Sequence, residues 1–548
     1  MTGSRSGGRI LVDNLVAQGC DRIFTVPGES FLAVLDALHD VPAIDLVVCR
    51  QEGGAAFMAA ADGKLTGRPG IAFVTRGPGA TNAAIGAHVA HQDSLPMILF
   101  VGDVARSDRD REAFQEVDFG RMFGPLAKQV LRIDDARRIP EYVARAYATA
   151  LAGRPGPVVV VLPEDMLTDI AAATDRPRVI RPRQPADPAA LDRLAALLGQ
   201  ARKPVAIVGG ADWSAAAGAA FAAWAERLAL PVAAAFRRQD AIPNASPVWA
   251  GNLGYGPNPR LAERIRDADL LLVVGPRLGE ATTDGYTLIT PDHPGQMLVH
   301  VHPDPAELNS VYRADLAICA DMLSFAEAAP AVTARFDGAA AHQEWRDWST
   351  PHNRPARLDL GPCVAAMRAA LPADAILCNG AGNFSAWWHR YWPYQGHGTQ
   401  LAPTAGAMGF GVPAAIAAAR RHPERMVVAL AGDGDLLMNG QELATAVATG
   451  CDLLVLVIDN GAYGTIRMHQ ERHYPGRISG TALHNPDFAA LGRAYGAWAE
   501  TVTETADFAP ALARAMAERG VRLLHLRTDI EQISPATTIS ALRQQPGG

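Results

Sequence analysis

Short apolar runs alternate with segments of helical periodicity in the first part of the chain. Apolar runs at 23–26, 44–48, 71–74 and 97–101 predict buried strands, and the stretches between them predict helices at 31–39, 52–65 and 81–91. A further run at 157–163 closes this segment. Strands that alternate with helices predict a parallel sheet covered by helices on both faces.

The same alternation returns twice further along the chain. A Pro- and Arg-rich stretch at 174–188 predicts an extended linker, and a second connector lies at 349–362. Buried strands are predicted at 205–208, 270–274 and 298–301, and then at 376–378, 427–430 and 453–458. We therefore predict an α/β protein of three consecutive doubly wound parallel-sheet domains, at residues 1–173, 189–335 and 358–548.

Composition narrows the class of protein. A formal net charge of −7 offers no basic surface for nucleic acid. The apolar runs are too short to span a membrane, and the first residues lack the apolar core of a signal peptide. The six cysteines are scattered without a CxxC pair, so we expect reduced thiols in a cytoplasmic protein.

Two polar motifs follow predicted buried strands in the third segment. The first is AGDGD at 431–435 and the second is DNGAYG at 459–464. Each alone would usually be a turn, but ligand sites of open α/β sheets form where strands end. Mg²⁺ favours oxygen ligands shared with phosphates, so we predict Asp433, Asn460 and the Ala462 carbonyl as ligands. The glycines and the helix predicted near Asp435 would let phosphates approach the backbone.

Together these motifs resemble the GDG-to-NN signature of thiamine diphosphate enzymes, with Asp459 in place of the first Asn. The resemblance implies pyrimidine-binding, middle and diphosphate-binding domains. The sequence CRQEGGAA at 49–56 is similar to the family's glutamate motif, which implies that Glu52 hydrogen-bonds the cofactor's pyrimidine N1′ and promotes loss of the C2 proton. On its own, a Glu in the first turn of a helix is usually a dipole partner.

The stretch PTAGAMGFGVP at 403–413 resembles another family motif. It implies that the Gly406 carbonyl meets the pyrimidine amine and that Met408 wedges between the two rings, although a Met beside a Gly-rich helix is usually a core residue. The cofactor-binding residues predicted in this way are Pro27, Glu52, Asn82, Gly382, Asn383, Gly406, Met408, Gly432, Asp433, Gly434, Asp435, Met438, Asn460, Ala462, Tyr463 and Gly464.

The chain most resembles the acetolactate synthase and pyruvate oxidase group, through GPGATN at 77–82, AFQE at 113–116, GRPGPV at 153–158 and HPDPAEL at 302–308. The resemblance implies a 2-oxo acid substrate and a second catalytic residue, Gln115, that hydrogen-bonds an intermediate. It also implies a site between two subunits, with Glu52 from one and Asp433 from its partner. We expect at least a homodimer, and a dimer of dimers fits the family. Predicted substrate-pocket residues are Glu29, Ser30, Phe114 and His469.

Several positions depart from this group. Glu164 replaces a Lys, His469 stands where a Trp shapes the acceptor pocket, and Glu29 falls where pyruvate decarboxylases carry an Asp. Ile466 replaces the second active-site Glu of those decarboxylases. The segment GPRLGEA at 275–281 keeps the Arg of a flavin-binding stretch but loses its acidic pair, so FAD stays open.

Three kinds of function remain after these departures. We expect a thiamine diphosphate- and Mg²⁺-dependent decarboxylase and carboligase similar to acetolactate synthase, acting on a pyruvate-type donor. The alternatives are a non-oxidative decarboxylase or lyase of the benzoylformate decarboxylase type, or a flavin-dependent oxidase. A non-catalytic binding or regulatory protein is disfavoured by Glu52, which cofactor holding alone does not require.

Overall fold

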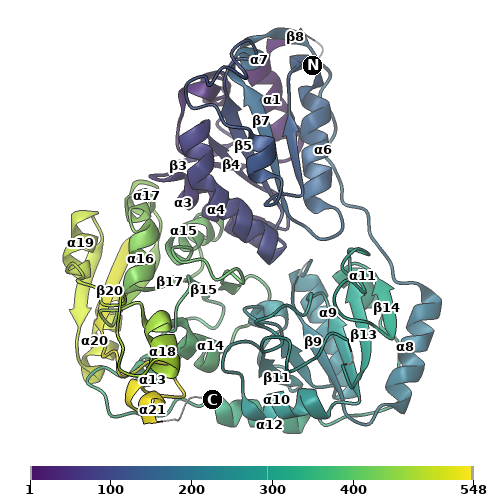
Figure 1. Ribbon diagram of the computed structural model, residues 1–548, viewed down its shortest axis with the longest axis vertical. Helices are drawn as coiled ribbons and strands as arrows, with labels where there is room; N and C mark the ends of the chain where they lie inside the picture. Colours follow the sequence, from purple (N-terminus) through teal and green to yellow (C-terminus); the bar gives the residue numbers. More distant parts are fainter. Residues whose placement is uncertain (1–2, 211, 293, 545–548) are drawn as a thin grey trace. The chain divides into compact units, whose positions relative to one another are not determined.

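The computed structural model describes residues 3–210, 212–292 and 294–544, and it contains three six-stranded sheets (Figure 1). The contacts divide the chain into two compact units. Unit 1 comprises residues 1–182, 412–422 and 439–451, and unit 2 comprises 183–411, 423–438 and 452–548. Each unit is described by itself below.

The first sheet lies in unit 1 and is parallel throughout, as predicted. Its strands run in the order β3 (Asp45–Val48), β2 (Arg22–Thr25), β4 (Gly70–Val74), β5 (Met97–Asp103), β7 (Pro157–Pro163) and β6 (Gln129–Arg132). Its helices are α1 (Gly7–Ala17), α2 (Leu32–His39), α3 (Glu52–Thr66), α4 (Gly77–Asp93), α5 (Phe119–Phe123), α6 (Ile139–Leu151) and α7 (Glu164–Thr168). A small antiparallel pair, β1 (Ser4–Ser6) and β8 (Ile170–Ala172), accompanies them.

Two helices from late in the sequence also belong to unit 1. They are α15 (Gly411–Arg421), of which residues 412–421 fall in the unit, and α17 (Glu442–Ala448). The helix α3 has clear end signals, because the Gln51 side chain accepts a hydrogen bond from Gly54 N and Gly67 ends the helix with φ +64°.

The second sheet lies in unit 2 and is parallel. Its order is β11 (Trp249–Asn252), β10 (Val232–Ala234), β9 (Pro204–Val208), β12 (Leu270–Val274), β13 (Met297–His302) and β14 (Leu316–Cys319). The associated helices are α8 (Pro188–Gln200), α9 (Ala215–Leu228), α10 (Pro259–Asp267), α11 (Met322–Ala328) and α12 (Gly338–Trp348).

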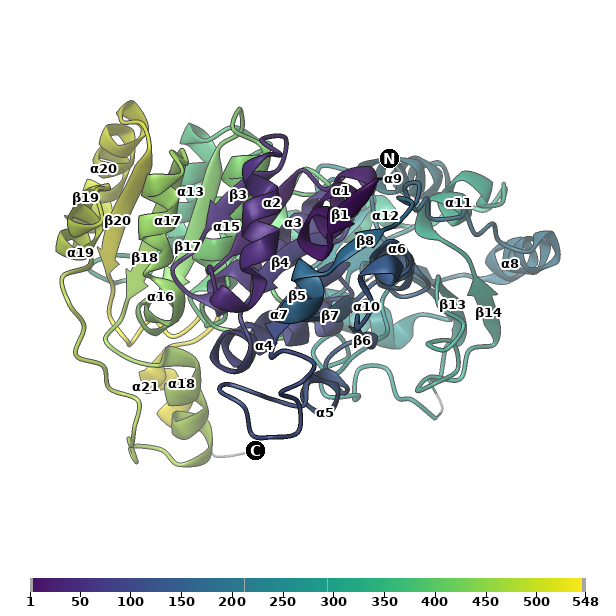
Figure 2. The same cartoon turned by 90° about the horizontal axis from the view of Figure 1, so that it is seen from above.

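The third sheet also lies in unit 2 and is parallel. Its order is β16 (Gln400–Leu401), β15 (Ile376–Asn379), β17 (Val427–Gly432), β18 (Leu453–Asp459), β20 (Val521–Arg527) and β19 (Trp498–Val502). Its helices are α13 (Leu360–Ala370), α14 (Ser385–Tyr391), α16 (Asp433–Asn439), α18 (Gly464–His473), α19 (Phe488–Ala494), α20 (Thr505–Ala517) and α21 (Ile539–Gln544). Figure 2 shows α18 beside α21, where Arg543 Nε lies 2.8 Å from Glu471 Oε2.

These sheets confirm the predicted fold class of three parallel-sheet α/β domains. Central strands such as β7 and β12 are buried at every position, which explains their continuous apolar sequence. The exact domain boundaries stay predictions. Within the described residues no helix is both long and apolar enough to cross a membrane.

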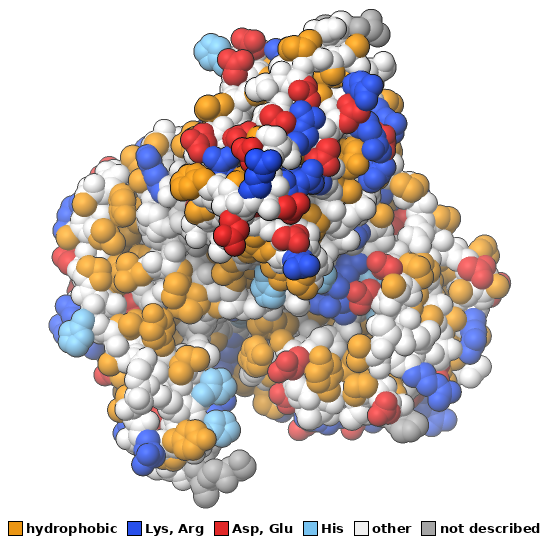
Figure 3. All heavy atoms as spheres, turned by 45° about the horizontal axis from the view of Figure 1, so that its top comes forward, with side chains coloured by type: hydrophobic (Ala, Val, Ile, Leu, Met, Phe, Trp, Pro, Cys, Tyr) orange, Lys and Arg blue, Asp and Glu red, His pale blue; other side chains and the backbone are white. Residues whose placement is uncertain are grey.

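On the face drawn in Figure 3, acidic and basic side chains are interspersed over the N-terminal part of the chain.

Candidate functional site

Glu52 lies at the carboxyl edge of the first sheet, as the first residue of α3. Asn82, on α4, donates a hydrogen bond from Nδ2 to Glu52 Oε2 at 2.9 Å. A Cβ added at Gly79 would lie 3.3 Å from Glu52 Oε1, so the first turn of α4 passes directly beside the carboxylate. The Glu52 carboxylate therefore accepts a hydrogen bond from α4 and packs against the first turn of that helix.

A buried glutamate from late in the sequence anchors the start of α3. Glu442 Oε1 accepts hydrogen bonds from Arg50 N at 3.1 Å and from Gln51 N at 2.9 Å, and its Oε2 accepts one from Thr445 Oγ1 at 2.6 Å. Burial raises the pKa of Glu442, and these hydrogen bonds oppose the shift. Sequence reasoning missed Glu442, because a single Glu in a helix gives no sign that its side chain is fully buried.

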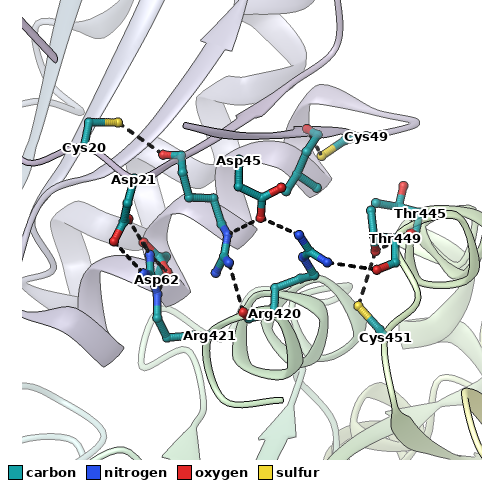
Figure 4. Close-up of polar contacts among 12 residues, drawn as sticks. Cys20, Asp21, Asp45, Cys49, Asp62, Arg420, Arg421, Thr445, Thr449 and Cys451 are labelled. Atoms are coloured by element: carbon teal, nitrogen blue, oxygen red, sulfur yellow. Dashed lines mark hydrogen bonds and ion pairs between the residues drawn. The ribbon is translucent and has the colours of Figure 1, made fainter. Parts of the chain in front are cut away.

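Ion pairs hold α15 to α3 and to the start of β3 within unit 1 (Figure 4). Arg421 Nε and Nη2 each lie 2.9 Å from a carboxylate oxygen of Asp62, and its Nη1 lies 3.0 Å from Asp21 Oδ2. Arg420 Nη2 lies 2.6 Å from Asp45 Oδ2. The helix is thus held by charges on α3 and at the start of β3.

Three of the predicted catalytic and pocket residues of unit 1, namely Glu29, Phe114 and Gln115, lie around Arg76, which precedes α4. Its Nη2 lies 2.5 Å from Glu29 Oε1, its Nη1 lies 3.0 Å from Glu164 Oε2, and its Nε lies 3.4 Å from Gln115 Oε1. The Arg76 guanidinium carbon lies 5.9 Å from the centroid of the Phe114 ring. Sequence reasoning singled out the other residues of this cluster but not the arginine that joins them.

The remaining predicted residues of this edge differ in exposure. Pro27 is exposed, whereas Ser30 is fully buried with its Oγ 2.9 Å from Thr75 Oγ1. A Cβ at Gly102 would lie 2.2 Å from Ser30 Oγ. Ser30 therefore packs between strand ends, and its place in a substrate pocket stays a prediction.

The predicted metal ligands lie at the carboxyl edge of the third sheet. Strand register pairs Gly432 with Ile458, so Asp433 and Asp459 follow at adjacent strand ends. Asn485 bridges them, with Nδ2 lying 2.8 Å from Asp433 Oδ2 and 2.8 Å from Asp459 Oδ1.

A histidine supports the second of these carboxylates. His525 Nε2 lies 2.9 Å from Asp459 Oδ2. Burial raises the pKa of Asp459, but hydrogen bonds from His525 and Asn485 outweigh it and leave the pKa below its ordinary value. His525 and Asn485 explain how a carboxylate is accommodated where the resembling family has an amide.

The Asp433 carboxylate is buried, and burial raises its pKa to about 6, with a smaller contribution from the charge of Asp459. A cation would stabilise the ionised form, so the site fits the predicted Mg²⁺. Within the described residues no three His, Cys, Asp or Glu side chains form a group that could hold a metal ion. The predicted set of one carboxylate, one amide oxygen and one carbonyl would leave the other coordination positions to phosphate oxygens or water.

The loop predicted to carry the pyrimidine ring is fixed from several directions. Gly406 has φ +70° and no atom within 4 Å of an added Cβ, whereas Met408 is half-buried. Asp435 Oδ1 accepts a hydrogen bond from Gly409 N at 2.9 Å, and burial raises the pKa of Asp435 to about 7. Arg237 Nη1 donates to the Pro403 carbonyl at 2.6 Å. Arg237 is a second residue that the sequence did not indicate.

The glycines predicted to face the diphosphate are closely packed. A Cβ at Gly382 or Gly432 would lie 2.8 Å from the Phe384 ring, and one at Gly434 would lie 2.6 Å from the Tyr463 ring. A larger residue at any of these positions would displace an aromatic ring, which is a reason for glycine at each.

The rest of the predicted residues in unit 2 lie in two loops and two helices. Asn383 accepts a hydrogen bond from Thr465 Oγ1 at 3.0 Å, and Asn460 Oδ1 accepts one from Ala462 N at 3.1 Å. A Cβ at Gly464 would lie 2.9 Å from Asn460 Nδ2. Met438 on α16 and His469 on α18 are exposed.

The glycine pair after β9 has a packing role. A Cβ at Gly210 would lie 2.2 Å from the Gly275 carbonyl oxygen, and one at Gly275 would lie 2.3 Å from the Gly209 carbonyl oxygen. Trp213 Nε1 donates to the Gly209 carbonyl at 2.8 Å. These contacts account for the glycines without a flavin, because they allow two strand ends to approach closely.

Models of known protein families match three parts of the chain. The N-terminal TPP binding domain of thiamine pyrophosphate enzymes matches residues 5–122, the central domain matches 191–329, and the C-terminal TPP binding domain matches 380–526. The chain therefore belongs to the thiamine pyrophosphate (thiamine diphosphate) enzymes, and it is an enzyme that depends on this cofactor.

Individual relatives of similar sequence are acetolactate synthase large subunits. The chain is 30% identical to the acetolactate synthase large subunit of Corynebacterium glutamicum, over 93% of this chain and 84% of that protein. It is 32% identical to the acetolactate synthase large subunit of Parasynechococcus marenigrum, over 91% of this chain and 84% of that protein. It is 29% identical to the acetolactate synthase isozyme 2 large subunit of Escherichia coli, over 97% of both chains.

Proposed function

We propose that this protein is a Mg²⁺-dependent 2-oxo acid decarboxylase and carboligase similar to acetolactate synthase, with a pyruvate-type donor. The observation that carries the proposal is the carboxylate of Glu52, which accepts a hydrogen bond from Asn82 at 2.9 Å at the start of a helix that Glu442 anchors. A merely solvated helix-terminal Glu would not need this support.

Thiamine diphosphate, when bound, supplies the electron sink that lets a 2-oxo acid lose carbon dioxide and pass its acyl unit to a second carbonyl. Glu52 would share a proton with the pyrimidine N1′, and Asn82 would hold the carboxylate in line for that hydrogen bond. The Gly406 carbonyl would accept from the pyrimidine amine, and the half-buried Met408 would lie against the rings.

The metal site is proposed to consist of Asp433, Asn460 and the Ala462 carbonyl. Its support is the burial of the Asp433 carboxylate, whose pKa is raised to about 6 and which a cation would relieve. Asn485 orients the Asp433 carboxylate, because its Nδ2 donates a hydrogen bond to Asp433 Oδ2 at 2.8 Å.

We further propose that the complete site forms between two copies of the chain. Glu52 would come from one subunit and the metal ligands from the other, which makes a homodimer the smallest active form and a dimer of dimers an allowed one. Light scattering of the active protein tests this part, and an active monomer would contradict it.

The test of the proposed reaction is product analysis after incubation with pyruvate, thiamine diphosphate and Mg²⁺. We expect acetolactate. Acetaldehyde as the only product would indicate simple decarboxylation, and hydrogen peroxide would indicate an oxidase. The proposal does not require FAD, and the absorbance spectrum of the purified protein shows directly whether a flavin is present.

A further inference from the structure

Arg76 is surrounded by acceptors of its own chain. Each of its three side-chain nitrogens faces an oxygen, from Glu29 at 2.5 Å, Glu164 at 3.0 Å and Gln115 at 3.4 Å. Three of the five N–H groups of the guanidinium therefore point at acceptors of the same chain. We call Arg76, Glu29, Glu164 and Gln115 the Arg76 cluster. Its one cation and two carboxylates give it a formal charge of −1.

The carboxylates, and not the arginine, are presented to the surroundings. The Arg76 side chain is 8% exposed, whereas those of Glu29 and Glu164 are 64% and 37% exposed. Phe114, whose ring lies beside Arg76, is 72% exposed. A ligand approaching this edge of unit 1 would meet negative charge and an apolar ring.

The loop that carries Gln115 is strained. Asp110, Glu112 and Gln115 have φ values of +64°, +51° and +65°, which non-glycine residues rarely adopt. The Glu116 carboxylate holds this loop by accepting hydrogen bonds from Asp110 N at 2.7 Å and Ala113 N at 2.9 Å. Strain of this kind persists where the surroundings enforce it, and it gathers at binding and catalytic sites.

The cluster is adjacent to Glu52 through the first turn of α4. Gly77 N, at the start of α4, donates to the Gln115 carbonyl at 3.0 Å, and Asn82 donates to Glu52 at 2.9 Å. Gly77 and Asn82, which are five residues or about 7.5 Å apart along α4, therefore each contact a candidate catalytic residue.

We propose that the Arg76 cluster selects against substrates with a second anionic group, so that the preferred donor is a 2-oxo acid with an uncharged remote end. This inference rests on the proposed function and specifies its substrate class. The physical cause is repulsion between the net negative cluster and a second carboxylate. If the second carboxylate of a substrate comes within about 6 Å of one net negative charge of the cluster, at an effective dielectric constant of about 40, the repulsion lowers the kcat/KM for that substrate about tenfold.

The test compares carbon dioxide release from 2-oxohexanoate and 2-oxoglutarate, which have similar lengths but differ in remote charge. In the wild type we expect a higher kcat/KM for 2-oxohexanoate. Glu29→Gln and Glu164→Gln should each raise the ratio of kcat/KM for 2-oxoglutarate to that for 2-oxohexanoate by about tenfold. Glu141→Gln is the matched control, because Glu141 on α6 pairs with Arg138, just before that helix, and with Arg145, so the ratio should stay unchanged.

The outcomes separate the two proposals. An unchanged ratio in both variants, or a wild-type preference for 2-oxoglutarate, would overturn the role of the Arg76 cluster while leaving the decarboxylase in place. Absence of thiamine diphosphate-dependent carbon dioxide release from these acids and from pyruvate would overturn the proposed function and this inference with it. Because Glu29 is largely exposed, Glu29→Gln should keep the wild-type melting temperature, which shows that a changed ratio does not come from unfolding.

Discussion

Replacing Arg421 with methionine should weaken the attachment of α15 to the domain that carries Glu52. Arg421 binds both oxygens of Asp62 at 2.9 Å, and Asp62 is only 5% exposed. Burial raises the pKa of Asp62, and the charge of Arg421 opposes that shift. Arg421→Met leaves a buried carboxylate without its cation, which typically costs about 3–5 kcal/mol.

Urea denaturation measures this cost. At a slope of about 2–3 kcal/mol/M, the midpoint of the transition that includes unit 1 should fall by about 1–2.5 M. In a double-mutant cycle, the variant with both Arg421→Met and Asp62→Asn should be about 2 kcal/mol more stable than Arg421→Met alone, because it buries no unpaired charge. A midpoint within about 0.3 M of wild type, or strictly additive single effects, would refute the view that this ion pair holds α15.

Three further predictions address the anchoring and metal residues. Glu442→Ala leaves two backbone N–H groups at the start of α3 without their acceptor, so it should lower the free energy of unfolding in urea by about 2–4 kcal/mol. Glu442→Gln keeps an acceptor and should lose less. An equal loss of stability in both variants would contradict the anchoring role. Asp433→Ala should weaken Mg²⁺-dependent binding of thiamine diphosphate about a hundredfold in calorimetry, and wild-type affinity would rule Asp433 out as a ligand. The pKa of Glu471 is lowered from 4.5 to about 2, mainly by the hydrogen bond from Arg543, so its stabilisation is present above pH 4.5 and is lost as pH falls toward 2. Glu471→Gln should therefore lower the urea midpoint more at pH 7 than at pH 4, and a pH-independent difference would argue against the ion pair.

The sequence predicted the parts of the fold that carry a local signal. Strands buried on both faces, such as β7 and β18, are continuous apolar runs, and α3 begins at Glu52 as expected. The motif containing Asp433 is likewise local, because the strand end and its glycines are contiguous in the chain.

The residues that the sequence did not indicate act across long separations in the chain. Glu442 anchors a helix that begins near residue 50, and Arg76 joins Glu29 to Glu164. A charged residue in a helix or loop usually marks a solvated face, so only folding shows that these side chains are buried and paired. The departures at Glu29 and Glu164 were visible as isolated substitutions, but their shared partner was not.

The most direct test of the role of Glu52 is the exchange of the C2 proton of bound thiamine diphosphate with deuterated water in Glu52→Gln. We predict that this variant still binds the cofactor with Mg²⁺ but exchanges the proton at least about a hundredfold more slowly than wild type, as expected for loss of a positioned acid–base partner. Exchange at the wild-type rate in a folded, cofactor-loaded Glu52→Gln protein would contradict the role assigned to Glu52.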